Sequence, residues 1–398
     1  MSAVHALTKV VTTRHVPRLL GSMLLGRLPA GMGALAVVLV VRGQGGDYAV
    51  AGVLAGVYAA GQAVGAPVLA RAVDRWRQTP PLLVGALASA AGFVVFGFVD
   101  VTAHPLVSGL AVLVAGAATP PIEPCLRVLW SDLLPDGVVH AAYSLDTASQ
   151  ELIFTFGPLI VLGAVAVAGP VAGVVAAAAV GLAGTLAFAT ARPSRAWQPI
   201  TAERHWAGPL RSARLVRLLF TVACVGFAIG VFTVAVTAHA EQVATRSASA
   251  WLLAANAFGA LAGGLVNATA RPARDPSGRL FRLMGLFAAG YLPLVFAPGL
   301  LGTMPLAFLS GLALPPVLAV SMVLVDTFAP AGTVTEAFAW VVTAFGVGNG
   351  IGSGVAGAVL DATSYPVAML LAVAGGAAGA LLALGAVVML RGRRPGRP

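Results

Sequence analysis

The segment Leu19–Leu39 reads LLGSMLLGRLPAGMGALAVVL and places a single charged residue, Arg27, near the centre of an apolar run. A helix needs about 20 apolar residues to cross a bilayer, and this run has that length. A charged side chain at the bilayer centre costs about 2.5–3.5 kcal/mol on insertion scales. The segment therefore predicts a transmembrane helix, and it predicts that Arg27 meets a partner inside the protein.

The rest of the chain has the same apolar character. It contains 398 residues, of which 59% are hydrophobic and 10% are charged. Soluble domains carry about 25% charged residues. This composition excludes a soluble fold and predicts an all-α integral membrane protein. The net charge of +10 is expected in cytoplasmic loops rather than in a surface for nucleic acid.

Apolar runs of span length, separated by Arg, Asp, Pro and Gly, predict twelve transmembrane helices. Their predicted ranges are 17–41, 49–70, 81–99, 105–130, 140–168, 171–191, 215–238, 248–270, 280–298, 303–327, 333–360 and 366–390. The longest loop divides the chain into an N-terminal six-helix bundle (1–191), a central loop (192–214) and a C-terminal six-helix bundle with a basic tail (215–398).

The basic residues predict the orientation. Of the 24 Lys and Arg residues, 21 fall on the side of both termini, two fall on the opposite side, and Arg27 lies within a span. Because cytoplasmic loops are enriched in Lys and Arg, both termini and the central loop are expected in the cytoplasm. The expected location is the inner (plasma) membrane of a bacterium.

The two halves of the sequence repeat each other. A shift of 195 residues carries Pro120 and Pro121 to Pro315 and Pro316, and it carries Gly157 to Gly352. Such a parallel repeat predicts two bundles related by a pseudo-two-fold axis along the membrane normal. Prolines at matching places kink the fourth and tenth spans, because proline removes a backbone donor.

The stretch ARAVDRWRQ, residues 70–78, resembles the cytoplasmic signature of the major facilitator superfamily between its second and third helices. Asp74 and Arg75 match that signature, whereas Arg77 and Gln78 replace its later Gly and Arg. The resemblance implies that Asp74 and Arg75 gate the transporter. Asp74 would lie at the helix N-terminus around 333–336, and Arg75 would pair with Asp132.

A second resemblance lies in the fifth span. The stretch FGPLIVLG, residues 156–163, is similar to the antiporter signature of the superfamily's bacterial drug-efflux branch. Gly157 and Pro158 match, but Ile153 stands where that signature has glycine. The resemblance implies drug/proton antiport.

The first half carries ionisable residues inside its spans: Arg27, Glu123, Arg127, Asp146 and Glu151. The positions equivalent to the last four in the second half are Leu318, Met322, Val341 and Gly346. The duplicated fold therefore does not require these charges, which favours a role in proton coupling. Structural compensation within one half is the alternative interpretation.

Depth in the membrane predicts the pairs. Arg27 and Glu151 both lie near the middle of their spans, so Glu151 is the first expected partner of Arg27 and Glu123 is the second. Asp146 lies level with Arg127, which follows Glu123 by one helical turn. A buried carboxylate that gains or loses its partner would bind or release a proton. A static pair that only joins two helices is the other possibility.

Polar side chains without charge are the candidate substrate contacts: Gln150, Asn256 and Asn349. The glycines around Asn349 equally favour simple helix packing. Little else in the second half is polar, so the pocket should suit a largely apolar ligand.

Together these features predict a monomeric secondary transporter that works by alternating access. Its expected partners are protons, a small-molecule substrate and the lipid bilayer, without nucleic acid, cofactor or metal. Export of hydrophobic or amphipathic molecules is favoured. Proton-coupled uptake of a sugar or organic acid is the alternative. A polytopic membrane enzyme is less favoured, because the histidines form no metal or catalytic motif.

Overall fold

The computed structural model describes residues 3–200, 205–243, 248–269, 273, 275–296 and 299–391. Helices dominate these residues, and no strand occurs among them. The helices are α1 Ala3–Thr12, α2 Val16–Gly43, α3 Tyr48–Arg75, α4 Thr79–Phe98, α5 Pro105–Ala117, α6 Ile122–Leu133, α7 Asp136–Ala168, α8 Pro170–Ala189, α9 Arg192–Ala196, α10 Ala213–Val243, α11 Ala248–Thr269, α12 Pro276–Tyr291, α13 Leu300–Gly311, α14 Leu314–Phe328, α15 Val334–Ala362 and α16 Tyr365–Arg391. Two 3₁₀ helices, η1 Gly208–Arg211 and η2 Leu292–Phe296, complete the described elements.

Ten helical segments of the described chain are long and apolar enough to cross a membrane. Two shorter apolar stretches, Leu152–Ala168 of α7 and Trp251–Asn267 of α11, coincide with the fifth and eighth predicted spans. The membrane-spanning fold predicted from the sequence is confirmed.

Breaks in the fourth and tenth spans lie near the paired prolines. The fourth span is divided into α5 and α6, which are separated by 118–121 and its two prolines. The tenth is divided into α13 and α14, and Pro315 and Pro316 lie in the first turn of α14. Each break frees backbone groups and starts a new helix in the middle of the membrane-spanning segment.

The pattern of helix packing repeats between the halves. In the first half α2 packs against α8 and α7, and α3 packs against α5; in the second half α10 packs against α16 and α15, and α11 packs against α13. A methyl group on Gly65 would overlap the carbonyl oxygen of Ala117, and one on Gly263 would overlap that of Leu312. Small residues thus permit the same close approach twice.

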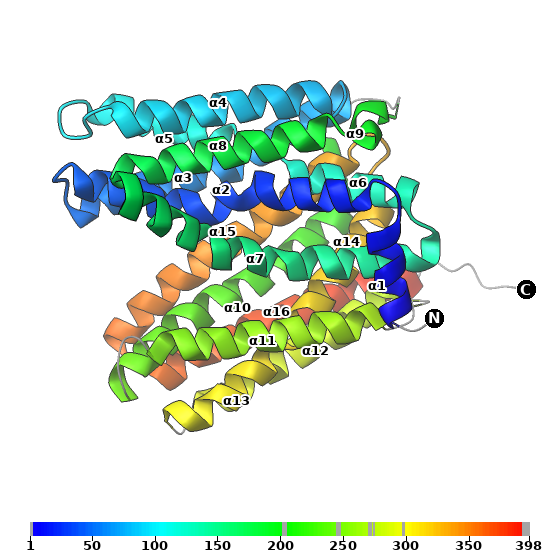
Figure 1. The fold of residues 1–398 in the computed structure, drawn as a ribbon. Coiled ribbons are helices and arrows are strands. Elements are labelled where there is room, and N and C mark those ends of the chain that lie inside the picture. The colour runs from blue at the N-terminus through cyan, green and yellow to red at the C-terminus, as the bar shows by residue number, and fades with distance from the viewer. Residues whose placement is uncertain are drawn as a thin grey trace, which may run out of the picture.

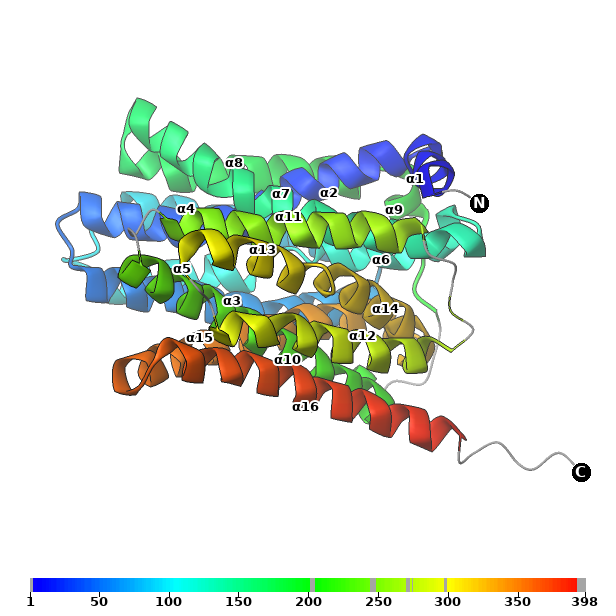
Figure 2. The ribbon, with the colours of Figure 1, turned by 90° about the horizontal axis from the view of Figure 1, so that it is seen from below.

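Figure 1 shows the first-half helices α3, α4, α5 and α8 gathered on one side and the second-half helices α10, α11, α12, α13 and α16 on the other. Contacts between the two bundles join α3 to α15 and join α7 to α11 and α14. The view in Figure 2 shows α16 along one edge of the second bundle. The boundaries 1–191, 192–214 and 215–398 remain a prediction.

Helix α1 was not predicted from the sequence. It precedes the first span and packs against α7 and α11. His15 separates α1 from α2 with a positive φ of 74°. The predicted central loop also contains short helical pieces, α9 and η1. We call the end of the molecule at which α3, α14 and α16 finish the arginine-rich end.

Candidate functional site

A charge cluster forms where α2, α6 and α7 meet; we use this name for Arg27, Glu123, Arg127, Asp146 and Gln150. Helix α6 begins at Ile122, directly after the proline break, so Glu123 occupies its first turn. A carboxylate is stabilised at that position by the helix dipole. Arg127 follows one turn later on the same face, and Asp146 approaches it from α7.

Glu123 is the centre of this cluster. Its Oε2 forms an ion pair with Nη1 of Arg27, and its Oε1 contacts Nη2 of Arg127. The amide Nε2 of Gln150 donates a 2.9 Å hydrogen bond to the same Oε1. One carboxylate therefore holds two guanidinium groups and one amide.

Arg127 extends the cluster to α7, since its Nε donates a 2.7 Å hydrogen bond to Oδ2 of Asp146. This contact agrees with the predicted equal depth of the two residues. The side chains of Glu123, Arg127 and Asp146 are 2%, 1% and 0% exposed, whereas that of Arg27 is 13% exposed. Two positive and two negative side chains thus lie together with little exposure to solvent.

The observed partner of Arg27 is Glu123, the second of the two predicted candidates. Close to Arg27, the backbone of Gly26 packs against that of Gly184, and a methyl group on Gly184 would overlap it. This contact holds α2 against α8. The side chain of Glu151, the first predicted partner, lies outside the described residues. The proton-coupling roles of all these residues remain predictions.

The candidate substrate residues are already engaged or packed. Gln150 binds Glu123, and Nδ2 of Asn256 donates a 2.9 Å hydrogen bond to Oγ of Ser310. That bond joins α11 to α13. The backbone of Asn349 lies against Gly226 and Gly230, so it marks the close contact between α15 and α10. Their substrate contacts remain predictions.

A second group of polar residues joins the halves at the arginine-rich end; we call Arg71, Asp74, Thr335 and Glu336 the α3–α15 clamp. The two carboxylate oxygens of Asp74 accept hydrogen bonds of 3.2 Å from the backbone N–H of Thr335 and 2.8 Å from that of Glu336. The predicted position of Asp74 at the start of this helix is confirmed. A carboxylate there satisfies otherwise unpaired helix N–H groups.

The other half of the clamp is a reciprocal ion pair. Arg71 donates from Nε and Nη2 to the carboxylate of Glu336, over 2.9 and 2.6 Å. Trp340 adds a 3.2 Å hydrogen bond from its indole nitrogen to Glu336. Each helix thus contributes one carboxylate that binds the other, and the bidentate geometry fixes their relative position.

The expected pair of Arg75 with Asp132 is not formed among the described side chains. The guanidinium of Arg75 lies 5.5 Å from the centre of the Trp76 ring. Asp132 is exposed near the end of α6. The gating roles of Arg75 and Asp132 remain predictions. Arg71, one turn before Arg75, is the arginine that binds a carboxylate of the other half. The sequence signature contained both residues but could not distinguish their partners.

Sequence reasoning also missed a contact between α7 and α14. The hydroxyl of Tyr143 donates a hydrogen bond to Oδ2 of Asp326. The ring of Phe338 lies 6.1 Å from that of Tyr143 and 5.8 Å from the guanidinium carbon of Arg127. Phe338 follows Glu336 by two residues, so one helix touches both the clamp and the charge cluster. The only signal was that Asp326 is acidic and lies inside a predicted span.

Three solved structures have the same overall arrangement. A bacterial homologue of the iron transporter ferroportin, in an outward-facing state, is 13% identical with a TM-score of 0.73, and the match covers 94% of this chain and 99% of that one. The human organic anion transporter MFSD10 (TETRAN) is 15% identical with a TM-score of 0.66, over 92% of this chain and 99% of that one. A variant of the E. coli fucose:proton symporter FucP is also 15% identical with a TM-score of 0.66, over 93% and 98%.

At these identities the structural likeness establishes the fold and leaves the substrate undefined. No curated protein matches the sequence. Residues 19–307 match the family pattern described as Major Facilitator Superfamily. This match covers more than half of the chain, and it agrees with the paired bundles and with the fold of all three solved transporters. The chain therefore belongs to the major facilitator superfamily of membrane transporters.

Proposed function

We propose that this transporter couples the export of hydrophobic or amphipathic small molecules to the movement of protons, by alternating access. The observation that supports this proposal best is the position of Glu123 between Arg27 and Arg127. A carboxylate with two cationic partners on different helices can be exchanged between them when the helices move. Such an exchange changes the net charge around Glu123, and an excess of negative charge favours proton binding to the carboxylate.

The protonation step follows from burial. A buried ion pair is stable while both partners are present, but removal of one leaves an uncompensated charge. Proton binding neutralises a carboxylate that has lost its cation. In our mechanism, displacement of α2 separates Arg27 from Glu123, and a proton then binds to the Glu123 carboxylate. When Arg27 returns, the ion pair forms again and the proton is released.

The α3–α15 clamp is the proposed gate. While Asp74 and Arg71 bind the start of α15, the two bundles are held together at the arginine-rich end. We place this end in the cytoplasm because most of the Lys and Arg residues lie there. The closed clamp then corresponds to an outward-facing state in a bacterial plasma membrane. Phe338 carries movement between clamp and charge cluster, since it contacts Arg127.

Transport of an organic acid is the second candidate. Arg27 keeps 13% of its side chain exposed, more than Glu123 or Arg127. A substrate carboxylate could bind Arg27 in place of Glu123, and the displaced Glu123 would then take up a proton. This alternative uses the same cluster, but it predicts anionic rather than apolar substrates.

Purified protein in liposomes with a trapped pH dye tests these proposals. Lipophilic cations, antibiotics, sugars and organic acids are added one at a time under an imposed proton gradient. Proton movement driven by apolar or cationic compounds would support export, and movement driven only by organic acids would favour the second candidate. Transport of labelled compounds without proton movement would contradict the coupling proposal.

A further inference from the structure

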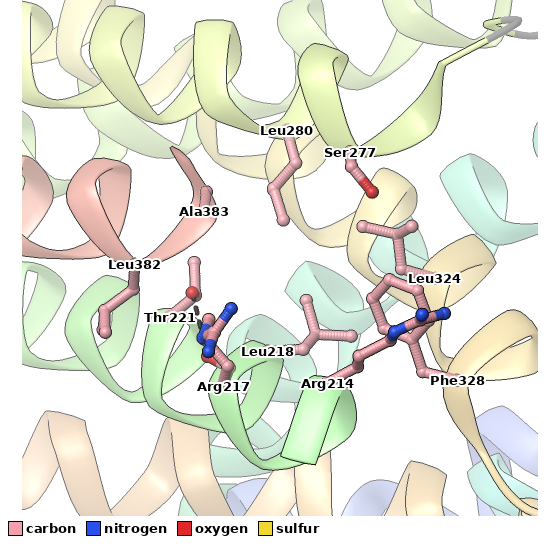
Figure 3. A pocket seen from close by; sticks show the side chains of 10 residues that line it. All are labelled: Arg214, Arg217, Leu218, Thr221, Ser277, Leu280, Leu324, Phe328, Leu382 and Ala383. Carbon is pink, nitrogen blue, oxygen red and sulfur yellow. Dashed lines mark hydrogen bonds between the residues drawn. The ribbon is translucent and has the colours of Figure 1, made fainter. Parts of the chain in front are cut away.

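A basic groove lies at the start of α10, away from the charge cluster and the clamp. It has a volume of about 430 Å³, and its lining includes Arg211, Arg217, Phe220 and Leu382. It adjoins a smaller pocket between α10, α12, α14 and α16, with which it shares Arg217 and Leu382. Figure 3 shows Arg214 and Arg217 of α10 in this pocket.

The charge of this groove is entirely positive. Arg211 and Arg217 line the groove, and Arg214 and Arg217 line the adjoining pocket; among the described residues no acidic side chain lines either of them. Within the part of the chain that the structure describes, neither Arg211 nor Arg214 is paired with a carboxylate. The hydroxyl of Ser277 points into the pocket from α12 and adds a hydrogen-bonding group. This lining suits a phosphate group.

The wall beyond the arginines is apolar. Val216 and Phe220 of α10 line this wall together with Leu382 of α16, whereas Arg211 precedes α10 at the end of η1. Phe220 is 62% exposed and lies six residues beyond Arg214, a rise of about 9 Å towards the membrane interior. A ligand that fills the groove must therefore be anionic at one end and apolar along its length.

The groove lies where the helices meet the membrane surface. Helix α10 begins at Ala213, α12 begins at Pro276 and α14 ends at Phe328, so all three terminate beside it. A headgroup at the arginines would lie at the interface, and its acyl chains would extend along Phe220. We infer that this groove is a binding site for an anionic phospholipid, which binds through its phosphate headgroup. A free phosphate ion would leave the apolar wall uncovered.

Thermal unfolding of the full-length protein in detergent tests this site. Short-chain phosphatidylglycerol is the probe, short-chain phosphatidylcholine is the neutral comparison, and inorganic phosphate tests for simple anion binding. Because each basic residue near a membrane surface contributes about fivefold to the affinity for anionic lipid, Arg211→Gln/Arg214→Gln should weaken binding by about 25-fold. The matched control is Arg192→Gln/Arg195→Gln, which removes the same charge from the exposed arginines of α9.

We expect phosphatidylglycerol to raise the unfolding temperature of the wild type and of the α9 control, and to raise it much less in the groove variant. An equal effect of phosphatidylcholine or of inorganic phosphate would overturn the proposal, as would an equal loss in the control. Native mass spectrometry of the wild type with both lipids in competition needs no variant. There we expect preferential retention of phosphatidylglycerol, and equal retention would also overturn the proposal.

Discussion

Helices α6 and α14 occupy equivalent places in the two halves, yet their interiors differ. Glu123 and Arg127 of α6 correspond to Leu318 and Met322 of α14, of which Met322 is buried in the core. Both helices follow a proline-associated break and pack into the same kind of bundle. The fold can therefore be built with apolar residues at these positions. Because buried charges are costly to desolvate, their presence in one half favours a role in transport.

The largest effect is expected when the first half is made to resemble the second. Arg127→Met should leave Glu123 and Asp146 without a shared cation and cost about 3–5 kcal/mol of stability. In Arg127→Met, Glu123 keeps Arg27 but Asp146 loses its cation. The double variant Arg127→Met/Asp146→Val removes this stranded carboxylate and introduces the residue of the second half, Val341, so it should unfold at a higher temperature than the single variant. Thermal unfolding in detergent measures both. Equal unfolding of single and double variants would contradict the pairing. Met322→Leu in the second half is the control and should cost less than about 1.5 kcal/mol.

The α3–α15 clamp provides the second test. Unlike the charge cluster, which occurs in one half only, the clamp connects the two halves. Glu336→Gln should lose the ion pair with Arg71 while keeping a side chain of the same shape. Half of the Arg71 side chain is exposed, so we expect a loss of only about 1 kcal/mol, or fivefold in the ratio of closed to open clamp. Cysteines introduced on either side of the protein and labelled with a water-soluble reagent would report the shift. Unchanged labelling on both sides would remove the clamp from the gating mechanism.

Asn256 tests packing within the second half. Asn256→Ala removes the hydrogen bond to Ser310 and should cost about 1 kcal/mol of stability. If Asn256 only joins α11 to α13, the affinity for a transported substrate should stay the same. A large loss of affinity with little change in unfolding temperature would instead assign it to the substrate site.

The smallest effect is expected at Arg75. Its exposed guanidinium contacts only the neighbouring Trp76 ring among the described side chains. Arg75→Gln should therefore change stability by no more than about 0.5 kcal/mol. The same labelling assay as for Glu336→Gln provides the comparison, and a shift as large as in that variant would restore the predicted role of Arg75.

The sequence predicts features that depend on a local pattern of residues. It does not predict which side chains from distant parts of the chain contact each other. Apolar runs and paired prolines identify the spans and the two mid-span breaks. The resemblance to the superfamily signature implies the position of Asp74 at the start of α15. The sequence did not predict the ion pair between Arg71 and Glu336, which lie 265 residues apart in the chain. Tyr143 and Asp326 lie 183 residues apart, and no local pattern links them. Helix α1 has only 10 residues, too few for a span.

The most direct test of proton coupling compares Glu123→Gln with the wild type in liposomes containing a trapped pH dye. The glutamine keeps the shape and can still accept a hydrogen bond from Arg27, but it cannot exchange a proton. Met322→Leu serves as the control in the second half. We predict that substrate-driven proton movement is lost in Glu123→Gln and retained in Met322→Leu, while both proteins still bind the substrate. Normal proton movement in Glu123→Gln would show that Glu123 is not the proton carrier, and it would contradict the proposed mechanism.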